Sequence, residues 1–257
     1  MSQSFECFRV EVDDHVAIVT IDRAPVNAQN RTFREEIVQI FDWLGDRQDV
    51  RAIVLTGAGK TFSAGADLRE RPSLSQTPGA YAAHNRLVRA SFDAVLSCAK
   101  PVIAAINGAA IGAGCVLATC CDILLASDAA YMQMTEVNVG LAGGVAHIRR
   151  HFGESDARLF ILTARRMSGS ELFRMGVTSA CTSAEDLMPA ALSIARDIAA
   201  KSPSAVRAAK KSFGLTENLS LEEGYRFEQS QTVALAGTKD TSEALAAFAE
   251  KRTPIFD

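Results

Sequence analysis

The sequence predicts an α/β protein with a core of alternating strands and helices and a helical C-terminal region. In the first half, short apolar runs typical of buried strands alternate with helical patterns. In the second half, helix-start signals dominate. The length of 257 residues suffices for one large domain with a substantial core. The pattern changes around residues 190–200, so we expect a core over 1–195 and a helical region over 196–257.

The first predicted elements are a β-hairpin and a helix. Residues 8–12 alternate apolar and polar side chains, and residues 15–21 follow after an Asp-Asp pair. Thr32 and Glu35 have the spacing of a capping box, which predicts a helix start. The apolar residues of this helix recur at helical spacing and would form one buried face: Phe33, Ile37, Ile40, Phe41 and Leu44.

The remaining core elements follow from apolar runs, and the C-terminal helices follow from their start signals. Buried strands are expected at 52–56, 102–106 and 123–126, with a helix over 79–97. Three further pairs have capping-box spacing, namely Ser168/Glu171, Thr182/Glu185 and Ser220/Glu223. Ser202 followed by Pro203 predicts another helix start. A final amphipathic helix is expected from Asp240 to near Lys251.

Composition excludes several classes of protein. With 27 basic and 30 acidic side chains, the net charge of −3 argues against nucleic-acid binding by bulk positive charge. No apolar run approaches the roughly 20 residues that span a bilayer, and the first residues lack the features of a signal peptide. The six cysteines lie mostly inside apolar runs without metal-site spacing. We therefore expect a cytoplasmic protein with neither a metal site nor a disulfide framework.

Two glycine-rich segments resemble nucleotide-binding loops only in part. Residues 57–61 end like a P-loop, but Val54 stands where that motif needs a glycine. Residues 112–114 follow a strand as a dinucleotide fingerprint would, but Leu117 occupies the place of its third glycine. Neither segment predicts a nucleotide site.

Two predicted strand–turn–helix junctions, at 61–68 and 107–114, consist largely of small residues. Small side chains let a ligand approach the backbone, and a helix N-terminus presents free N–H groups. If both junctions converge, their amides would form an oxyanion hole, although tight helix–strand packing would also explain such residues. Glu136 lies in a mostly uncharged segment, so its carboxylate is either a solvated loop group or a semi-buried acid.

Together these segments resemble the crotonase superfamily, the enoyl-CoA hydratase/isomerase family. Four segments carry the resemblance in the right order: 23–28 (RAPVNA), 60–68 (KTFSAGADL), 100–114 with Cys121-Asp122 after it, and 248–256 (FAEKRTPIF). The resemblance implies a crotonase-like spiral of ββα turns with C-terminal helices. It also implies an acyl-CoA thioester substrate, no cofactor besides the coenzyme A of that substrate, and a homotrimer or homohexamer.

The resemblance also implies roles for individual residues. The amides of Ala64 and Ala113 would bind the thioester oxygen. Glu136 would be the catalytic acid/base. Further substrate contacts are expected at Ala66, Asp67, Leu68, Gly112, Val116 and Tyr131. Arg23 and Lys251 are candidates for binding CoA phosphates.

The sequence departs from the hydratase pattern at one of two glutamates. Glu136 matches the second glutamate of family hydratases, but Val116 occupies the place of the first. Valine cannot hold water or relay a proton, whereas one carboxylate suffices to move a proton along an enolate. We therefore expect double-bond isomerisation of an enoyl-CoA. Hydration of a 2-enoyl-CoA, decarboxylation or carbon–carbon cleavage on an acyl-CoA, and non-catalytic acyl-CoA binding remain alternatives.

Overall fold

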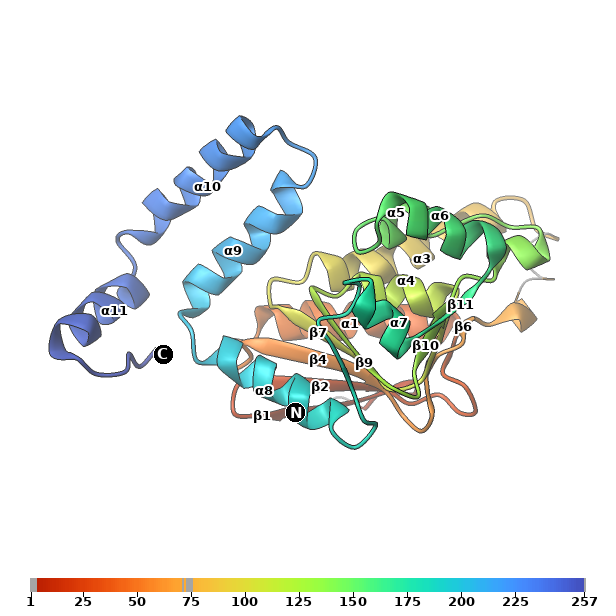
Figure 1. Ribbon diagram of the computed structural model, residues 1–257, viewed down its shortest axis with the longest axis horizontal. Helices are drawn as coiled ribbons and strands as arrows, with labels where there is room; N and C mark the ends of the chain where they lie inside the picture. Colours follow the sequence, from red (N-terminus) through yellow and green to blue (C-terminus); the bar gives the residue numbers. More distant parts are fainter. Residues whose placement is uncertain (1–3, 71, 73–75, 257) are drawn as a thin grey trace.

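The computed structural model describes residues 4–70, 72 and 76–256, and its strands form two sheets and a short pair (Figure 1). The larger sheet has the order β1 (Phe8–Asp13), β2 (Val16–Ile21), β4 (Ala52–Gly57), β7 (Val102–Ile106), β9 (Ile123–Ser127) and β12 (Ala180–Thr182). The smaller sheet has the order β11 (Arg166–Ser168), β10 (Tyr131–Gln133), β8 (Ala109–Ile111) and β5 (Thr61–Ser63). The short pair is β3 (Ala28–Gln29) with β6 (Gly65–Ala66). The predicted hairpin is the antiparallel pair β1–β2, and the predicted buried strands are β4, β7 and β9.

The chain repeats a strand–strand–helix unit that passes from one sheet to the other. Strands β4, β7 and β9 lie in parallel in the larger sheet, and β5, β8 and β10 after them lie in parallel in the smaller sheet. Helices α3 (Ala80–Leu96) and α4 (Ala113–Thr119) close the first two units. This arrangement confirms the predicted α/β spiral of ββα turns.

Helices cover both faces of the larger sheet. On one face, α1 (Arg31–Asp46), α3 and α4 enclose the main core, to which α1 contributes the apolar residues predicted for it. On the other face lies α8 (Leu187–Ala199), whose Leu187, Ala191 and Ala195 pack on strand residues such as Val54 and Ile103. The expected boundary at residue 195 thus falls inside a helix that packs on the sheet.

The remaining helices lie around the smaller sheet and at the C-terminal end. They are α5 (Val145–Ile148), α6 (Glu154–Thr163), α7 (Gly169–Arg174), α9 (Pro203–Thr216), α10 (Leu221–Leu235) and α11 (Lys239–Glu250), together with the 3₁₀ turns η1 (Leu68–Glu70) and η2 (Glu136–Val139). Helices α9 to α11 extend away from the sheets (Figure 1). Lys210 of α9 forms an ion pair with Asp122 at 2.8 Å, and Arg51 donates to the carbonyl of Phe256 at 2.7 Å. These contacts attach the helical region to the core.

Two of the predicted capping boxes form, and two do not. Ser168/Glu171 caps α7 and Ser220/Glu223 caps α10, while Ser202 caps α9. The predictions for Thr32 and Thr182 were wrong. Asn30 precedes Thr32 and is itself a strong capping residue, and its side chain accepts the Phe33 amide at 2.9 Å. Thr182 lies in β12, paired with β9, so α8 begins only at Leu187.

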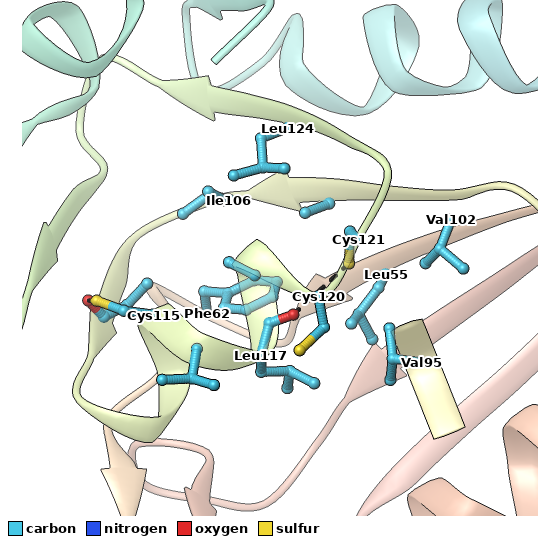
Figure 2. Packing of buried hydrophobic residues seen from close by; sticks show 14 of the residues in the cluster. Leu55, Phe62, Val95, Val102, Ile106, Cys115, Leu117, Cys120, Cys121 and Leu124 are labelled. Carbon is cyan, nitrogen blue, oxygen red and sulfur yellow. Dashed lines mark hydrogen bonds between the residues drawn. The ribbon is translucent and has the colours of Figure 1, made fainter. Parts of the chain in front are cut away.

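The cysteines of α4 and the turn after it are packing residues. Figure 2 shows Cys115, Cys120 and Cys121 among apolar side chains such as Phe62 and Leu117. All three are buried and reduced, and burial raises the pKa of the Cys120 thiol to about 12. None of the described helices is both long enough and apolar enough to span a membrane.

Candidate active site

Strand β6 and the start of α4 lie in direct contact. Gly65 has φ +84°, and a Cβ atom placed there would lie 2.4 Å from the Ile111 carbonyl oxygen and 3.1 Å from the Ala113 nitrogen. Such contacts leave no room for a side chain, so glycine is required at position 65. The two small-residue junctions predicted from the sequence therefore converge.

Ala113 presents a main-chain amide at this contact. It is the first residue of α4, and the first intrahelical bond runs from the Val116 amide to the Gly112 carbonyl at 3.1 Å. The amides of the first turn of a helix have no partner within the helix. Ala113 is half-buried beside Gly65, so its N–H can serve a ligand placed at the junction.

The second predicted amide donor, that of Ala64, is already engaged. It donates to the Val26 carbonyl at 3.0 Å, within the backbone pairing that continues into β3 and β6. In this structure the amide is therefore not available to the thioester oxygen. Three residues later, Asp67 N–H donates to the Gln29 carbonyl at 3.0 Å. Because successive amides of an extended chain point to opposite sides, the exposed Ala66 directs its N–H away from β3.

Glu136 lies beside the start of α4. It follows β10 and begins η2, and the Gly112 amide donates to the Gln133 carbonyl at 2.8 Å, which joins β10 to the turn before α4. A Cβ atom at Gly112 would lie 2.6 Å from Glu136 Oε1. The half-buried carboxylate is thus held against the residue that precedes Ala113.

Val116, one turn after Gly112, is buried in an apolar environment. Its side chain is only 4 % exposed and belongs to the main core. A Cβ atom at Gly144 would lie 2.8 Å from Val116 Cγ2 and 2.7 Å from Met134 Cε. The position at which the resemblance implies the first hydratase glutamate therefore holds an aliphatic side chain in an apolar environment.

Asp67 organises the loop that follows β6. Its buried carboxylate forms ion pairs with Arg69 at 2.6 Å and with Arg23 at 3.2 Å. Hydrogen bonding from the Arg69 guanidinium, with the Arg23 charge nearby, holds the pKa of Asp67 well below its usual range. Arg23 also donates to the Ala28 carbonyl at 3.0 Å. Leu68, the next residue of the loop, is exposed.

Two further predicted site residues are Tyr131 and Lys251. The central carbon of the Arg166 guanidinium lies 3.4 Å from the centroid of the Tyr131 ring. Tyr131 pairs with Ala109 on β8 rather than with the turn at Gly112. Lys251 ends α11, which lies at the other end of the molecule from β6 (Figure 1). Arg23 and Lys251 therefore do not form one phosphate site within a single chain.

Sequence reasoning missed Gln29, a buried polar residue at the junction. Its Nε2 donates to the Ala113 carbonyl at 3.1 Å and to Ser63 Oγ at 3.2 Å. The available signal was a polar side chain directly after residues 23–28, between the predicted hairpin and the first helix. Its partners lie 34 and 84 residues away in the sequence, so no local pattern indicates them.

Comparison with known proteins identifies the family. Residues 11–257 match the family model described as enoyl-CoA hydratase/isomerase. The chain is 36 % identical to a probable enoyl-CoA hydratase of Mycobacterium bovis over 98 % of both chains. It is 32 % identical to a mitochondrial Delta(3,5)-Delta(2,4)-dienoyl-CoA isomerase of Pongo abelii, over 97 % of this chain and 81 % of that one.

The fold comparison agrees with the sequence comparison. The crystal structure of an enoyl-CoA hydratase from Bacillus anthracis superposes with a TM-score of 0.91 at 32 % identity, covering 98 % of this chain and 99 % of the other. The chain belongs to the enoyl-CoA hydratase/isomerase family of the crotonase superfamily. The prediction of a crotonase-family enzyme is confirmed.

Proposed function

We propose that this enzyme isomerises an enoyl-CoA, moving the double bond from C3–C4 to C2–C3 with Glu136 as the only acid/base. One observation carries the proposal: a carboxylate lies at the junction of β6 and α4, while the neighbouring position 116 holds a buried valine. Isomerisation needs one proton acceptor that later returns the proton, and it needs no bound water.

The proposed reaction proceeds through a thioester enolate. The Glu136 carboxylate removes a proton from C2 of the 3-enoyl-CoA, and the electron pair of that C–H bond delocalises onto the thioester oxygen. The carboxyl group then returns the proton to C4 as the enolate collapses to the 2-enoyl-CoA. Atoms and electrons balance without a redox partner or a second substrate.

The oxyanion hole is proposed to consist of the Ala66 and Ala113 amides. The exposure of Ala66, the direction of its N–H and the contact between Gly65 and Ala113 support this pair. In comparable sites, one such donor stabilises the transition state by about 2.7–4 kcal/mol. The loop residues Asp67 and Leu68 remain proposed contacts for CoA, with Arg23 as the basic group beside them.

Hydration of a 2-enoyl-CoA is the second candidate. Relatives such as that of Mycobacterium bovis are named as enoyl-CoA hydratases, which favours this activity. Against it stands the apolar surrounding of Val116, because addition of water needs a positioned water molecule and two acid/base functions.

A parallel assay separates the two candidates. Purified enzyme is given 3-enoyl-CoA or 2-enoyl-CoA, and both the double-bond shift and the addition of water are followed. We expect isomerisation to exceed hydration and Glu136→Gln to abolish it, with acyl-CoA binding retained. Rapid hydration by both the wild type and Glu136→Gln would contradict the isomerase assignment and the role of Glu136. Retained CoA binding without turnover by the wild type would instead support a binding protein.

We further propose that the enzyme is a homotrimer or homohexamer. Large apolar side chains of the C-terminal helices are exposed to 77–91 %: Phe213, Leu221, Val233 and Phe248. Large exposed apolar patches mark protein–protein interfaces, and burial of these side chains between subunits would form one. Size-exclusion chromatography with light scattering should give the mass of three or six chains. The double variant Leu221→Lys/Phe248→Lys should have a lower mass. A monomeric wild type would contradict this proposal.

A further inference from the structure

We propose that Gln29 is a positioning residue that sets the distance between the two amides of the oxyanion hole. This inference rests on the proposed function, since it assumes that the Ala66 and Ala113 amides bind the thioester oxygen. Gln29 lies on β3 and is 2 % exposed, so it does not itself reach the substrate.

The main chain of Gln29 holds the segment that carries the first amide. Gln29 is paired with Ala66 in the parallel β3–β6 pair. Its carbonyl accepts the Asp67 amide at 3.0 Å. The orientation of the intervening Ala66 N–H therefore depends on this pairing.

The side chain of Gln29 holds the segment that carries the second amide. Nε2 donates to the carbonyl oxygen of Ala113, the same residue whose nitrogen lies beside Gly65. Its other partner, Ser63 Oγ, donates to the Asn27 carbonyl at 2.8 Å and accepts the Gly65 amide at 3.3 Å. A carbonyl oxygen can only accept, so the amide group must point its NH₂ towards Ala113.

One buried residue thus connects both walls of the site. The contact between Gly65 and Ala113 leaves no side chain to separate or brace the two backbones. A hydrogen bond that spans them fixes their spacing, and displacement by about 1 Å in such sites can cost roughly 100-fold in rate. Without the Gln29 amide, the Ala113 carbonyl would lose a partner at a place where burial makes that loss costly.

The test compares Gln29→Met, which keeps the length of the side chain but removes the donor, with Thr56→Val. Thr56 is a matched control because its hydroxyl also donates to a buried carbonyl, that of Ala105 at 2.9 Å, within the larger sheet. For each variant, kcat and KM for 3-enoyl-CoA, the melting temperature and the carbonyl stretching frequency of a bound saturated acyl-CoA are measured.

We expect Gln29→Met to lower kcat by about 10- to 100-fold, with KM changed less than about 3-fold. The carbonyl band should move back towards its frequency in solution, whereas Thr56→Val should lower only the melting temperature. An unchanged band and kcat in Gln29→Met would overturn the proposal. An equal loss of kcat in both variants would overturn it too.

A second variant and a measurement without turnover distinguish failure of this proposal from failure of the proposed function. If Gln29→Met does not fold, Gln29→Asn, one methylene too short to span the gap, should show the same loss of kcat and the same band shift. If the wild type isomerises no substrate, the proposed function fails, but the carbonyl band of a bound saturated acyl-CoA still decides the role of Gln29. A wild-type band identical to that in solution would overturn both.

Discussion

The Glu136 carboxylate packs against Gly112 so closely that no side-chain carbon fits between them. A Cβ atom at Gly112 would lie 2.6 Å from Glu136 Oε1 and 3.4 Å from its Cδ. Gly112 also has φ +52°, a backbone conformation that L side chains rarely adopt. The glycine before the helix therefore places both the Ala113 amide and the acid.

Gly112→Ala should displace the Glu136 carboxylate and reduce isomerisation by roughly 100-fold. Strain at position 112 should lower the free energy of unfolding by about 1–3 kcal/mol. Gly143→Ala is the matched control, because nothing lies within 4 Å of a Cβ atom there and its φ is not positive. Steady-state kinetics with denaturant unfolding measures both effects, and an active Gly112→Ala enzyme would contradict the placement of Glu136.

Replacing single backbone amides by esters should distinguish the two alanines of the first junction. An ester at Ala66 removes the proposed donor and should lower kcat by about 100- to 1000-fold. An ester at Ala64 removes the hydrogen bond to Val26 and should cost about 1 kcal/mol of stability, with kcat nearly unchanged. If the ester at Ala64 lowers kcat and that at Ala66 does not, the Ala64 amide is the donor to the thioester oxygen.

Val116→Glu should add a second carboxylate to the site and raise hydration of 2-enoyl-CoA at least about tenfold. Its apolar neighbours Met134 and Gly144 should make the variant less stable by roughly 2–4 kcal/mol. Val116→Gln has the same shape without an acid and should show the loss of stability alone. Unchanged hydration by Val116→Glu would mean that position 116 does not act on the substrate.

Glu171 should make the fold sensitive to acid. The Ser168 amide and hydroxyl, with Arg165, lower the pKa of Glu171 to about 2. A lowered folded-state pKa adds stability above the unfolded value of about 4.3, and this stability is lost as the pH falls towards 2. Glu171→Gln should therefore be less stable by about 1 kcal/mol near neutral pH, with the difference vanishing at low pH.

The control for this prediction is Glu185→Gln, since Glu185 is exposed and belongs to the capping box that does not form. Its free energy of unfolding should stay within about 0.5 kcal/mol of the wild type. Denaturant unfolding across the pH range measures both variants. A difference for Glu171→Gln that persists unchanged at pH 2 would contradict the assigned role of its charge.

Local patterns predicted the elements well where one side chain decides them. Both halves of the capping box form at Ser168 with Glu171 and at Ser220 with Glu223. The N-cap of α1 is Asn30 rather than Thr32. Thr182 lies in β12, where it pairs with β9. In both cases a competing hydrogen bond, one nearby and one distant in sequence, decided where the helix starts.

The sequence alone determined the spiral α/β core, the family and the place of a single glutamate opposite a valine, because these depend on residue types and their spacing. Only the tertiary structure decided which amide is available, since the Ala64 N–H is used by Val26, a residue 38 positions earlier in the chain. The same holds for Gln29, whose side chain joins β5 and the start of α4, two segments that are far apart in the sequence. Strand pairing in the folded chain decides where a backbone amide points and whether it already has an acceptor. The order of side chains in the sequence does not reveal this pairing.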